Sequence, residues 1–399
     1  MSDTVLEPTA SETVAQDVSE FVRLRRDIHQ HPELAFDEHR TSELVAQSLS
    51  RWGYAVTRGL GGTGVVGQLR KGQGHKRLGL RADMDALPIQ EETGLPHASC
   101  RDGVMHACGH DGHTAMLLAA AKRLALQTDF DGTLNLIFQP AEEGFGGAKK
   151  MMEHGLFERF PCDAIFAMHN MPGFKPGHLL LRKGATMASS ENITITLHGK
   201  GGHGAMPHTA ADPVVAGAAI VMGLQTIVSR NVAPLQMAVI TVGSFKAGQA
   251  NNVIPQTATL ELSVRSLDRG VRQLLNQRIR ELCEAQALSY GVRAELQFRG
   301  GYPVLVNTAA ETDFATQVAR EVVGPDRVDA HTDALTGSED FAFMLEQVPG
   351  SYLFIGNGDA STGGHGACMV HNPGYDFEDS NIAVGSAYWV RLVERYLVR

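Results

Sequence analysis

The order of apolar patterns between residues 189 and 300 is the feature that most constrains how this chain can fold. Six segments follow one another there as strand, helix, strand, strand, helix and strand. In the first, "ITITLHG", Ile193, Ile195 and Leu197 share one face and polar residues alternate with them. The second, "DPVVAGAAIVMGLQTIVSR", begins like a helix, with Asp212 as N-cap and Pro213 at the first helical position. The order βαββαβ predicts a ferredoxin-like domain.

The chain on either side of this segment has a different pattern. Before it, helical periodicity alternates with short apolar runs, and mixed α/β character returns after residue 300. A chain of 399 residues also exceeds what one hydrophobic core usually holds. We therefore predict an α/β protein in which residues 1–188 and 301–399 form one discontinuous domain, with a mixed, mostly parallel sheet flanked by helices. Residues 189–300 are predicted to be inserted into it.

Charge and cysteine content exclude several classes of partner. The formal net charge is -9 without any run of Lys or Arg, which argues against nucleic acid and anionic membranes as partners and favours a small-molecule substrate. The N-terminus "MSDTVLEPTASETVAQ" lacks the basic and apolar parts of a secretion signal, and we expect no membrane-spanning segment. Five scattered cysteines make no disulfide framework. A cytoplasmic protein is expected.

Potential metal ligands concentrate where predicted strands end. Four polar side chains directly follow apolar runs: Asp83, Glu142, Glu143 and His169. In open α/β sheets, ligands bind outside the carboxyl ends of the strands, so these groups are expected at one rim. The stretch "MHACGHDGHT" adds Cys108 and His110 at the entry to a helix, and "MVHNPGYDFED" adds His371. A thiolate, three imidazoles and a carboxylate are the ligand types that a first-row divalent metal selects.

Each of these residues also has an ordinary explanation. A single histidine is commonly a buried residue with a hydrogen-bond partner, a single cysteine is commonly a small apolar core residue, and paired glutamates suit a solvated helix start. Their coincidence at one sheet rim favours the metal site. His113 stays open: it could be a ligand, a residue that orients a ligand, or part of a helix face.

The motifs of this chain resemble a known family. The stretches "RRDIHQHPELAFDEHRTS", "RADMDALP", "MHACGHDGHT", "QPAEEG", "GKGGHGAMPH", "NVIP", "GSEDFA" and "HNPGYDFED" are similar, in this order, to the amidohydrolases that include hippurate hydrolase, aminoacylase and indole-acetyl-amino-acid hydrolase. That group belongs to the wider metallopeptidase family of the glutamate carboxypeptidases. The resemblance runs from about residue 20 to the C-terminus.

The resemblance implies two divalent metal ions and names their ligands. The identity of the ions stays open among zinc, manganese, nickel and cobalt. Glu142 matches the general base, and Asp83 matches an aspartate that orients a ligand. Related enzymes carry His-x-Asp where this chain has Arg81-Ala82-Asp83, so one histidine ligand is missing here. The residues that match the metal ligands are Cys108, His110, Glu143, His169 and His371.

For the inserted domain, the resemblance implies a lid that also dimerises. His203 in "GKGGHGAMPH" would polarise the scissile carbonyl, and in the wider family this histidine reaches the site of the other subunit. Asn252 and Arg265 match positions that hold the substrate carboxylate, although Arg265 could also be a solvated charge at a strand end. Glu339 and Asp340 lie in the motif "GSEDF" without an assigned role. A homodimer or a dimer of dimers is expected.

The leading hypothesis is a metal-dependent amidohydrolase that splits an N-acyl amino acid into a carboxylate and a free amino acid. Amide hydrolysis needs a Lewis acid and an acidified water. Glu142 would move the proton while Glu143 binds metal, and side-chain alternation along a strand would separate the two. A dipeptidase or an N-acetyl-diaminopimelate deacetylase would share the site. A thiol hydrolase with Cys108 activated by His110, and a protein that only stores metal or binds a ligand, are the alternatives from other classes.

Overall fold

The computed structural model describes residues 10–398, so part of the N-terminal stretch discussed above lies outside it. The chain divides into two compact units. The first contains the residues up to Gly184, then Asn307–Thr332, and then Phe343 onward; the second contains Ala185–Val306 and Asp333–Ala342. Three of the four boundaries between the units fall within β7 (Gly184–Met187), β14 (Leu305–Asn307) and α10 (Phe341–Leu345), and the fourth lies between Thr332 and Asp333.

The first unit is built on an eight-stranded mixed sheet, as predicted. Its strand order is β1-β2-β4-β3-β5-β16-β6-β15. The central strands β4, β3, β5 and β16 run parallel, whereas β1, β2 and β4 pair antiparallel at one edge and β6 is antiparallel to β16. The strands are β1 (Ala55–Leu60), β2 (Gly64–Lys71), β3 (Arg77–Asp83), β4 (Gly132–Gln139), β5 (Ala164–Pro172), β6 (Leu179–Leu180), β15 (Val328–Asp329) and β16 (Gly350–Gly358).

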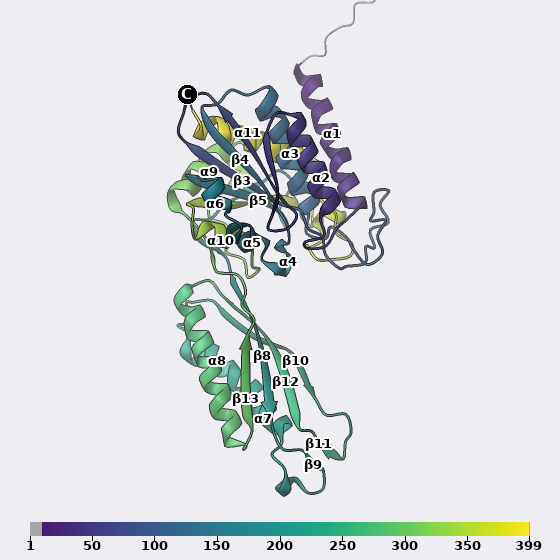
Figure 1. Ribbon diagram of the computed structural model, residues 1–399, viewed down its shortest axis with the longest axis vertical. Coiled ribbons are helices and arrows are strands. Elements are labelled where there is room, and N and C mark those ends of the chain that lie inside the picture. The colour runs from purple at the N-terminus through teal and green to yellow at the C-terminus, as the bar shows by residue number, and fades with distance from the viewer. Residues whose placement is uncertain (1–9, 399) are drawn as a thin grey trace, which may run out of the picture. The chain divides into compact units, whose positions relative to one another are not determined.

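Helices cover both faces of this sheet (Figure 1). Leu134, Leu136 and Phe138 alternate along β4 into a core shared with the long helices, while Asn135 points to the other face and donates to the carbonyl of Pro161. The long helices are α1 (Ala10–Gln30), α2 (His39–Arg51), α3 (His110–Leu126), α9 (Ala309–Val323) and α11 (Asn381–Tyr396); α4 (Glu142–Phe145), α5 (Gly147–Glu153) and α6 (Leu156–Arg159) are short.

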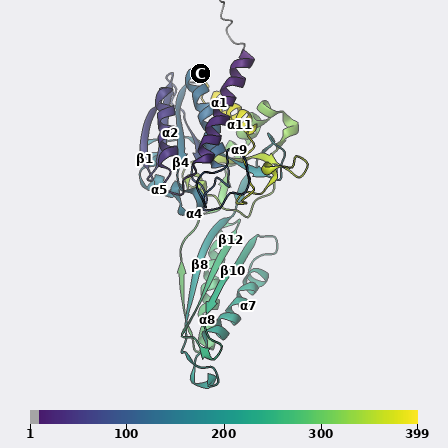
Figure 2. The ribbon, with the colours of Figure 1, turned by 90° about the vertical axis from the view of Figure 1, so that its right-hand side faces the viewer.

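The second unit has the predicted ferredoxin-like order. Its elements are β8 (Ser189–His198), α7 (Pro213–Asn231), β10 (Ala238–Ala247), β12 (Thr257–Ser266), α8 (Arg269–Ser289) and β13 (Arg293–Phe298). They form an antiparallel sheet of order β10-β12-β8-β13, and the two helices cover one face of it (Figure 2). Asp212 caps α7 by accepting from the N–H of Val214 at 2.8 Å, and Pro213 is the first residue of this helix, as predicted. A small ribbon of β9 (Gly202–His203) and β11 (Val253–Ile254) is separate from the sheet.

One helix of the second unit resembles a membrane-spanning segment in length and composition. Helix α7 is long and apolar enough, by length and composition, to cross a membrane. In the structure, one face of it packs on the sheet of the second unit, where Ala216, Ile220, Leu224 and Ile227 are fully buried. A core helix of this unit requires the same apolarity as a membrane-spanning helix, so composition alone does not distinguish the two.

Candidate metal centre

The carboxyl ends of three neighbouring strands bring the predicted ligands of the first unit together. Asp83 is the last residue of β3 and pairs in register with Gln139, the last residue of β4. His169 lies in β5, which runs parallel to β3 on its other side. Because these strands are parallel, their ends share one edge of the sheet, and the Glu142–Glu143 pair follows β4 at the same edge.

Three of the predicted ligands form a buried group at this edge. Ligand atoms of Cys108, His110 and His169 all lie within 4.8 Å of one another. The Cys108 Sγ is 3.4 Å from the His169 Nε2, and the other ring nitrogen of His169 is 2.6 Å from the carbonyl of Asn170, which fixes the orientation of the ring. One thiol and two imidazoles at this spacing are typical of a transition-metal site.

Gly109, between Cys108 and His110, allows this arrangement. Its φ of 90° is in the left-handed region, and it forms the N-cap of α3. A Cβ at this position would lie 2.2 Å from the Asn170 Oδ1 and 2.5 Å from the Tyr375 hydroxyl. Only glycine satisfies both conditions, so the chain can present two ligands on either side of a tight turn.

Glu143 and His371 complete a second group around the same thiol. Ligand atoms of Cys108, Glu143 and His371 lie within 4.8 Å of one another, and so do those of His110, Glu142 and Glu143. The His371 Nε2 is 3.2 Å from the Glu143 Oε1, and the His371 side chain is half-exposed. His371 has a positive φ of 65°, and its N–H donates to the carbonyl of Ala107. All five predicted metal ligands are therefore gathered in the first unit.

The two glutamates are separated by a turn and not by strand alternation as expected. β4 ends at Gln139, Pro140 follows, and Ala141 has a left-handed φ of 54°. Glu142 begins the short α4, and Glu143 departs from helical geometry, with φ -70° and ψ 71°. Proline cannot continue the ladder of hydrogen bonds, which explains why the strand stops before the pair.

The donor set fits a divalent cation. The His110 Nε2 is buried and makes no hydrogen bond to any residue of the described chain. Burial, and then the charges of Glu143 and Glu142, raise the pKa of the Cys108 thiol well above its ordinary value. A thiolate at this position therefore needs a cation beside it, which disfavours the thiol-hydrolase hypothesis.

Asp83 is held mainly by Arg81 and His113. Its Oδ2 is 2.6 Å from the Arg81 Nη1, and its Oδ1 is 2.6 Å from the His113 Nδ1. The His113 Nε2 lies 2.7 Å from the Asn170 Oδ1, so protein groups occupy both ring nitrogens of His113. Burial opposes ionisation of Asp83, but His110, Arg81 and His113 together hold its pKa well below the ordinary value. His113 is therefore placed as a supporting partner more than as a ligand.

Asp85 is a residue of the site that sequence reasoning missed. Its Oδ1 is 3.3 Å from the His110 Nδ1. Its two oxygens also accept from the backbone N–H groups of Glu142 and Glu143, at 3.0 and 2.9 Å. Asp85 thus orients one predicted ligand and fixes the backbone of the glutamate pair. The available signal was its place in "RADMD", two residues after Asp83.

The other three predicted residues belong to the second unit. His203 and Asn252 are neighbours on the ribbon of β9 and β11, where His203 pairs with Val253 and the Asn252 carbonyl accepts from Gly204. Both side chains are exposed. Arg265 is near the end of β12, where it donates to Ser338 at 2.7 Å. The strand begins at Thr257, shortly after the ribbon. Arg265 is eight residues further along the strand, a distance of roughly 27 Å.

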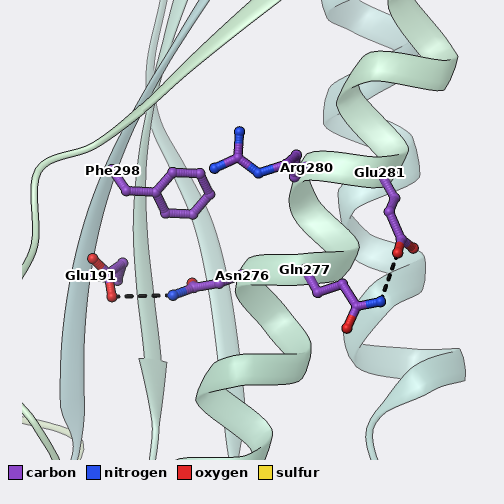
Figure 3. A pocket seen from close by; sticks show the side chains of 6 residues that line it. All are labelled: Glu191, Asn276, Gln277, Arg280, Glu281 and Phe298. Atoms are coloured by element: carbon purple, nitrogen blue, oxygen red, sulfur yellow. Dashed lines mark hydrogen bonds between the residues drawn. The ribbon is translucent and has the colours of Figure 1, made fainter.

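Two further features of the second unit carry none of the predicted ligands. Glu339 accepts from the N–H of Phe341 at 2.9 Å, and Asp340 is fully buried. A pocket between α8 and β13 is lined by Glu191, Asn276, Gln277, Arg280, Glu281 and Phe298 (Figure 3). Its polar groups pair within the protein: Asn276 donates to Glu191, Gln277 donates to Glu281, and the Arg280 guanidinium lies 4.7 Å from the centroid of the Phe298 ring.

Comparison with known proteins identifies the family. Residues 79–395 match the model of peptidase family M20/M25/M40. Hippurate hydrolase of Campylobacter jejuni is 46% identical over 378 residues, which cover 95% of this chain and 97% of that protein. The N-acetyldiaminopimelate deacetylase of Exiguobacterium sibiricum is 37% identical, over 86% of this chain and 92% of that protein. The chain belongs to peptidase family M20/M25/M40.

A solved structure supports the same assignment. A Bacillus subtilis protein described as a dinuclear metal-binding peptidase of the M20 family superposes with a TM-score of 0.83 at 32% identity. The match covers 96% of this chain and 99% of that one. The predicted family and enzyme class, a metal-dependent amidohydrolase, are confirmed.

Proposed function

We propose that this protein hydrolyses the amide bond of N-acyl-L-amino acids, releasing a carboxylate and a free amino acid. The observation that carries the proposal is the group of one thiol, three imidazoles and a carboxylate at one sheet edge, of which Cys108, His110 and His169 are buried, with a second glutamate beside it. The likeness to hippurate hydrolase supports an N-acyl amino acid as the substrate class.

Two divalent cations would be held by Cys108, His110, Glu143, His169 and His371. When bound, they supply a Lewis acid for the carbonyl and a water whose pKa falls from ~15.7 towards ~7. Either zinc, manganese, nickel or cobalt suits this mixture of sulfur, nitrogen and oxygen donors. The description of the Bacillus subtilis relative as dinuclear supports the number of ions.

Glu142 would act as the general base and then as the general acid. It is buried beside Glu143 but is separated from it by the turn at α4. In this role its carboxylate takes a proton from the attacking water and returns it to the nitrogen of the leaving amino acid. Asp83 would keep His113 and His110 oriented during the reaction, because it lies 2.6 Å from the first and 3.8 Å from the second.

The active form would be a homodimer, or a dimer of dimers, in which His203 of one chain serves the other. Within one second unit, Arg265 lies near the end of β12. The ribbon that carries His203 and Asn252 lies at the opposite end of this strand. Asn252 and Arg265 of the same chain therefore cannot bind one small carboxylate together. Two chains related by a two-fold axis could supply one residue each. His203 would then donate to the developing oxyanion.

The test is a substrate panel. Metal-reconstituted protein is assayed against benzoyl-, acetyl- and indoleacetyl-amino acids, before and after chelation of the metal. Hydrolysis that disappears on chelation and returns with one of the four metals is the expected result. Activity that survives chelation but is abolished by iodoacetamide would instead identify a thiol hydrolase.

A second candidate function is supported by one comparison. The N-acetyldiaminopimelate deacetylase is 37% identical over 86% of this chain, so a diamino acid could be the product. A dipeptidase would use the same metal centre. Adding N-acetyl-diaminopimelate and a set of dipeptides to the panel separates the three, because the preferred substrate has the highest kcat/KM.

A cytoplasmic location completes the proposal. All five cysteines are free thiols. Reduced cysteines are usual where the thiol pool is kept reduced.

A further inference from the structure

Glu38 stands at the start of α2 but does not cap this helix. It occupies the N-cap position, and its side chain makes no capping hydrogen bond. Glu33 caps the helix in its place: its two carboxylate oxygens accept from the N–H groups of Arg40 and Thr41, each at 2.9 Å. The carboxylate of Glu38 is therefore free of the role that its position would predict.

The Glu38 carboxylate instead connects two strained segments of the backbone. It is fully buried, and its Oε1 accepts from the N–H of Phe36 at 3.0 Å and from the N–H of Ala141 at 2.9 Å. Its Oε2 accepts from the Thr63 hydroxyl. Phe36 and Ala141 have φ of 64° and 54°, and in the described chain only His371 among the other non-glycine residues has positive φ. This conformation is sterically unfavourable for a non-glycine residue and persists only where the surroundings hold it.

Ala141 directly precedes the two glutamates of the site. Three successive N–H groups, those of residues 141, 142 and 143, are bound by two buried carboxylates: Glu38 holds the first and Asp85 holds the other two. Burial raises the pKa of Glu38 to about 6, so at neutral pH its bonds are made by the ionised form. The hydrogen bonds of Glu38 and Asp85 thus fix the backbone of residues 141–143, and with it the directions of the Glu142 and Glu143 side chains.

We propose that Glu38 is a positioning residue for the Glu142–Glu143 pair. By holding Ala141 in the left-handed region, it aims both carboxylates at the metal centre from a segment 103 residues earlier in the chain. The proposal rests on the proposed function for what the two glutamates do, and on the hydrogen bonds above for how they are placed.

The test compares Glu38→Ala with Glu33→Ala. Each change removes a carboxylate that accepts from two backbone N–H groups, but only Glu38 touches residue 141. Metal affinity is measured by competition with a chelator, kcat and KM with the best substrate of the panel, and folding by thermal unfolding. We expect Glu38→Ala to weaken metal binding and to lower kcat by about 10–100-fold each, with KM little changed. Glu33→Ala should lower only the unfolding temperature.

Two more variants separate positioning from general loss of structure. Glu38→Gln keeps an oxygen that accepts from both N–H groups, and should bind metal within a few-fold of wild type. Ala141→Gly, placed in the Glu38→Ala protein, should recover about tenfold, because glycine adopts positive φ without the steric cost that alanine has.

Equal metal affinity and kcat in the folded Glu38→Ala and Glu33→Ala proteins would overturn the proposal, and so would a Glu38→Ala protein that glycine at position 141 does not improve. If the wild-type protein hydrolyses no member of the panel, the proposed function fails, while the chelator competition still decides the role of Glu38.

Discussion

The two units of the molecule hold their candidate functional residues in opposite ways. In the first unit, Cys108, His110 and His169 are buried, and the orientation of His169 is fixed by a second contact. In the second unit, His203 and Asn252 are exposed on a two-stranded ribbon, and the ring of His203 has only a local bond, from the N–H of Ala205. A buried polar group needs a partner at its site, from the chain itself, a water or a bound ion, whereas an exposed group is also accessible to another molecule. The potential metal ligands of the first unit are thus held in place by their own unit, whereas His203 and Asn252 are accessible to another molecule.

The largest effect is expected within the first unit, at the glutamate pair. Glu142→Gln should keep both metals and substrate affinity and should lower turnover by 10²–10⁴-fold or more, because it removes only proton transfer. Glu143→Gln should lose metal instead. Metal analysis of the purified variants and steady-state kinetics check both statements, and the reverse pattern would mean that the two roles are exchanged.

The His203→Ala variant tests whether an exposed residue of the second unit contributes to catalysis. His203→Ala should lower kcat by roughly 10²–10³-fold, the cost of losing one donor to an oxyanion, without changing metal content. Mixing His203→Ala chains with Glu142→Gln chains should restore activity, because one of the two sites in a mixed dimer then has a complete set of residues. A mixture that exchanges subunits and stays inactive would show that the histidine does not serve a partner.

The Cys108→Ala variant tests whether Cys108 is a metal ligand or only a buried core residue. We expect metal affinity to fall by at least about tenfold. Losing a direct ligand should weaken metal binding no less than losing a residue that only orients a ligand. Cys283→Ala is the matched control, because this thiol is also buried but lies in the core of the second unit. Metal per chain is measured in both variants after dialysis. Wild-type stoichiometry in Cys108→Ala would remove this residue from the ligand set.

Much of the fold followed from patterns along the sequence, and so did the gathering of the ligands. The βαββαβ order and the cap at Asp212 are local features, and they predicted the second unit. The rule that ligands bind at the carboxyl ends of parallel strands placed Asp83 and His169 at one edge, where the structure has them. These predictions succeeded because apolar periodicity is set by burial, which the sequence records directly.

The missed features depend on backbone conformation and on distant hydrogen bonds. Neither the left-handed turn at Ala141 nor the contact of Glu38 with it has a pattern in the sequence, because the two residues are 103 positions apart. Asp85 was missed because its main partners are backbone N–H groups, which every residue except proline possesses.

The last and smallest expected effect concerns stability. It involves His29, a buried residue of the first unit outside the ligand set. Its Nδ1 lies 2.8 Å from the Asp111 Oδ2, and its Nε2 lies 3.4 Å from the Glu91 Oε2. Burial disfavours the charged ring and Arg25 opposes it, but Asp111 and Glu91 outweigh both and raise the pKa of His29 to about 9.

Because the pKa of His29 is higher in the folded protein than its ordinary value of 6.5, protonation of His29 stabilises the fold. This stabilisation is complete below about pH 6.5 and is lost as the pH rises through about 9, and it amounts to at most about 3 kcal/mol. We expect the free energy of unfolding of the metal-free first unit to fall over this range in the wild type and to change less in His29→Gln. Tryptophan fluorescence reports this unit alone, since Trp52 and Trp389 both belong to it. His31→Gln, just after the end of the same helix and half-exposed, is the control. An unchanged pH slope in His29→Gln would show that the protonated ring does not stabilise the first unit.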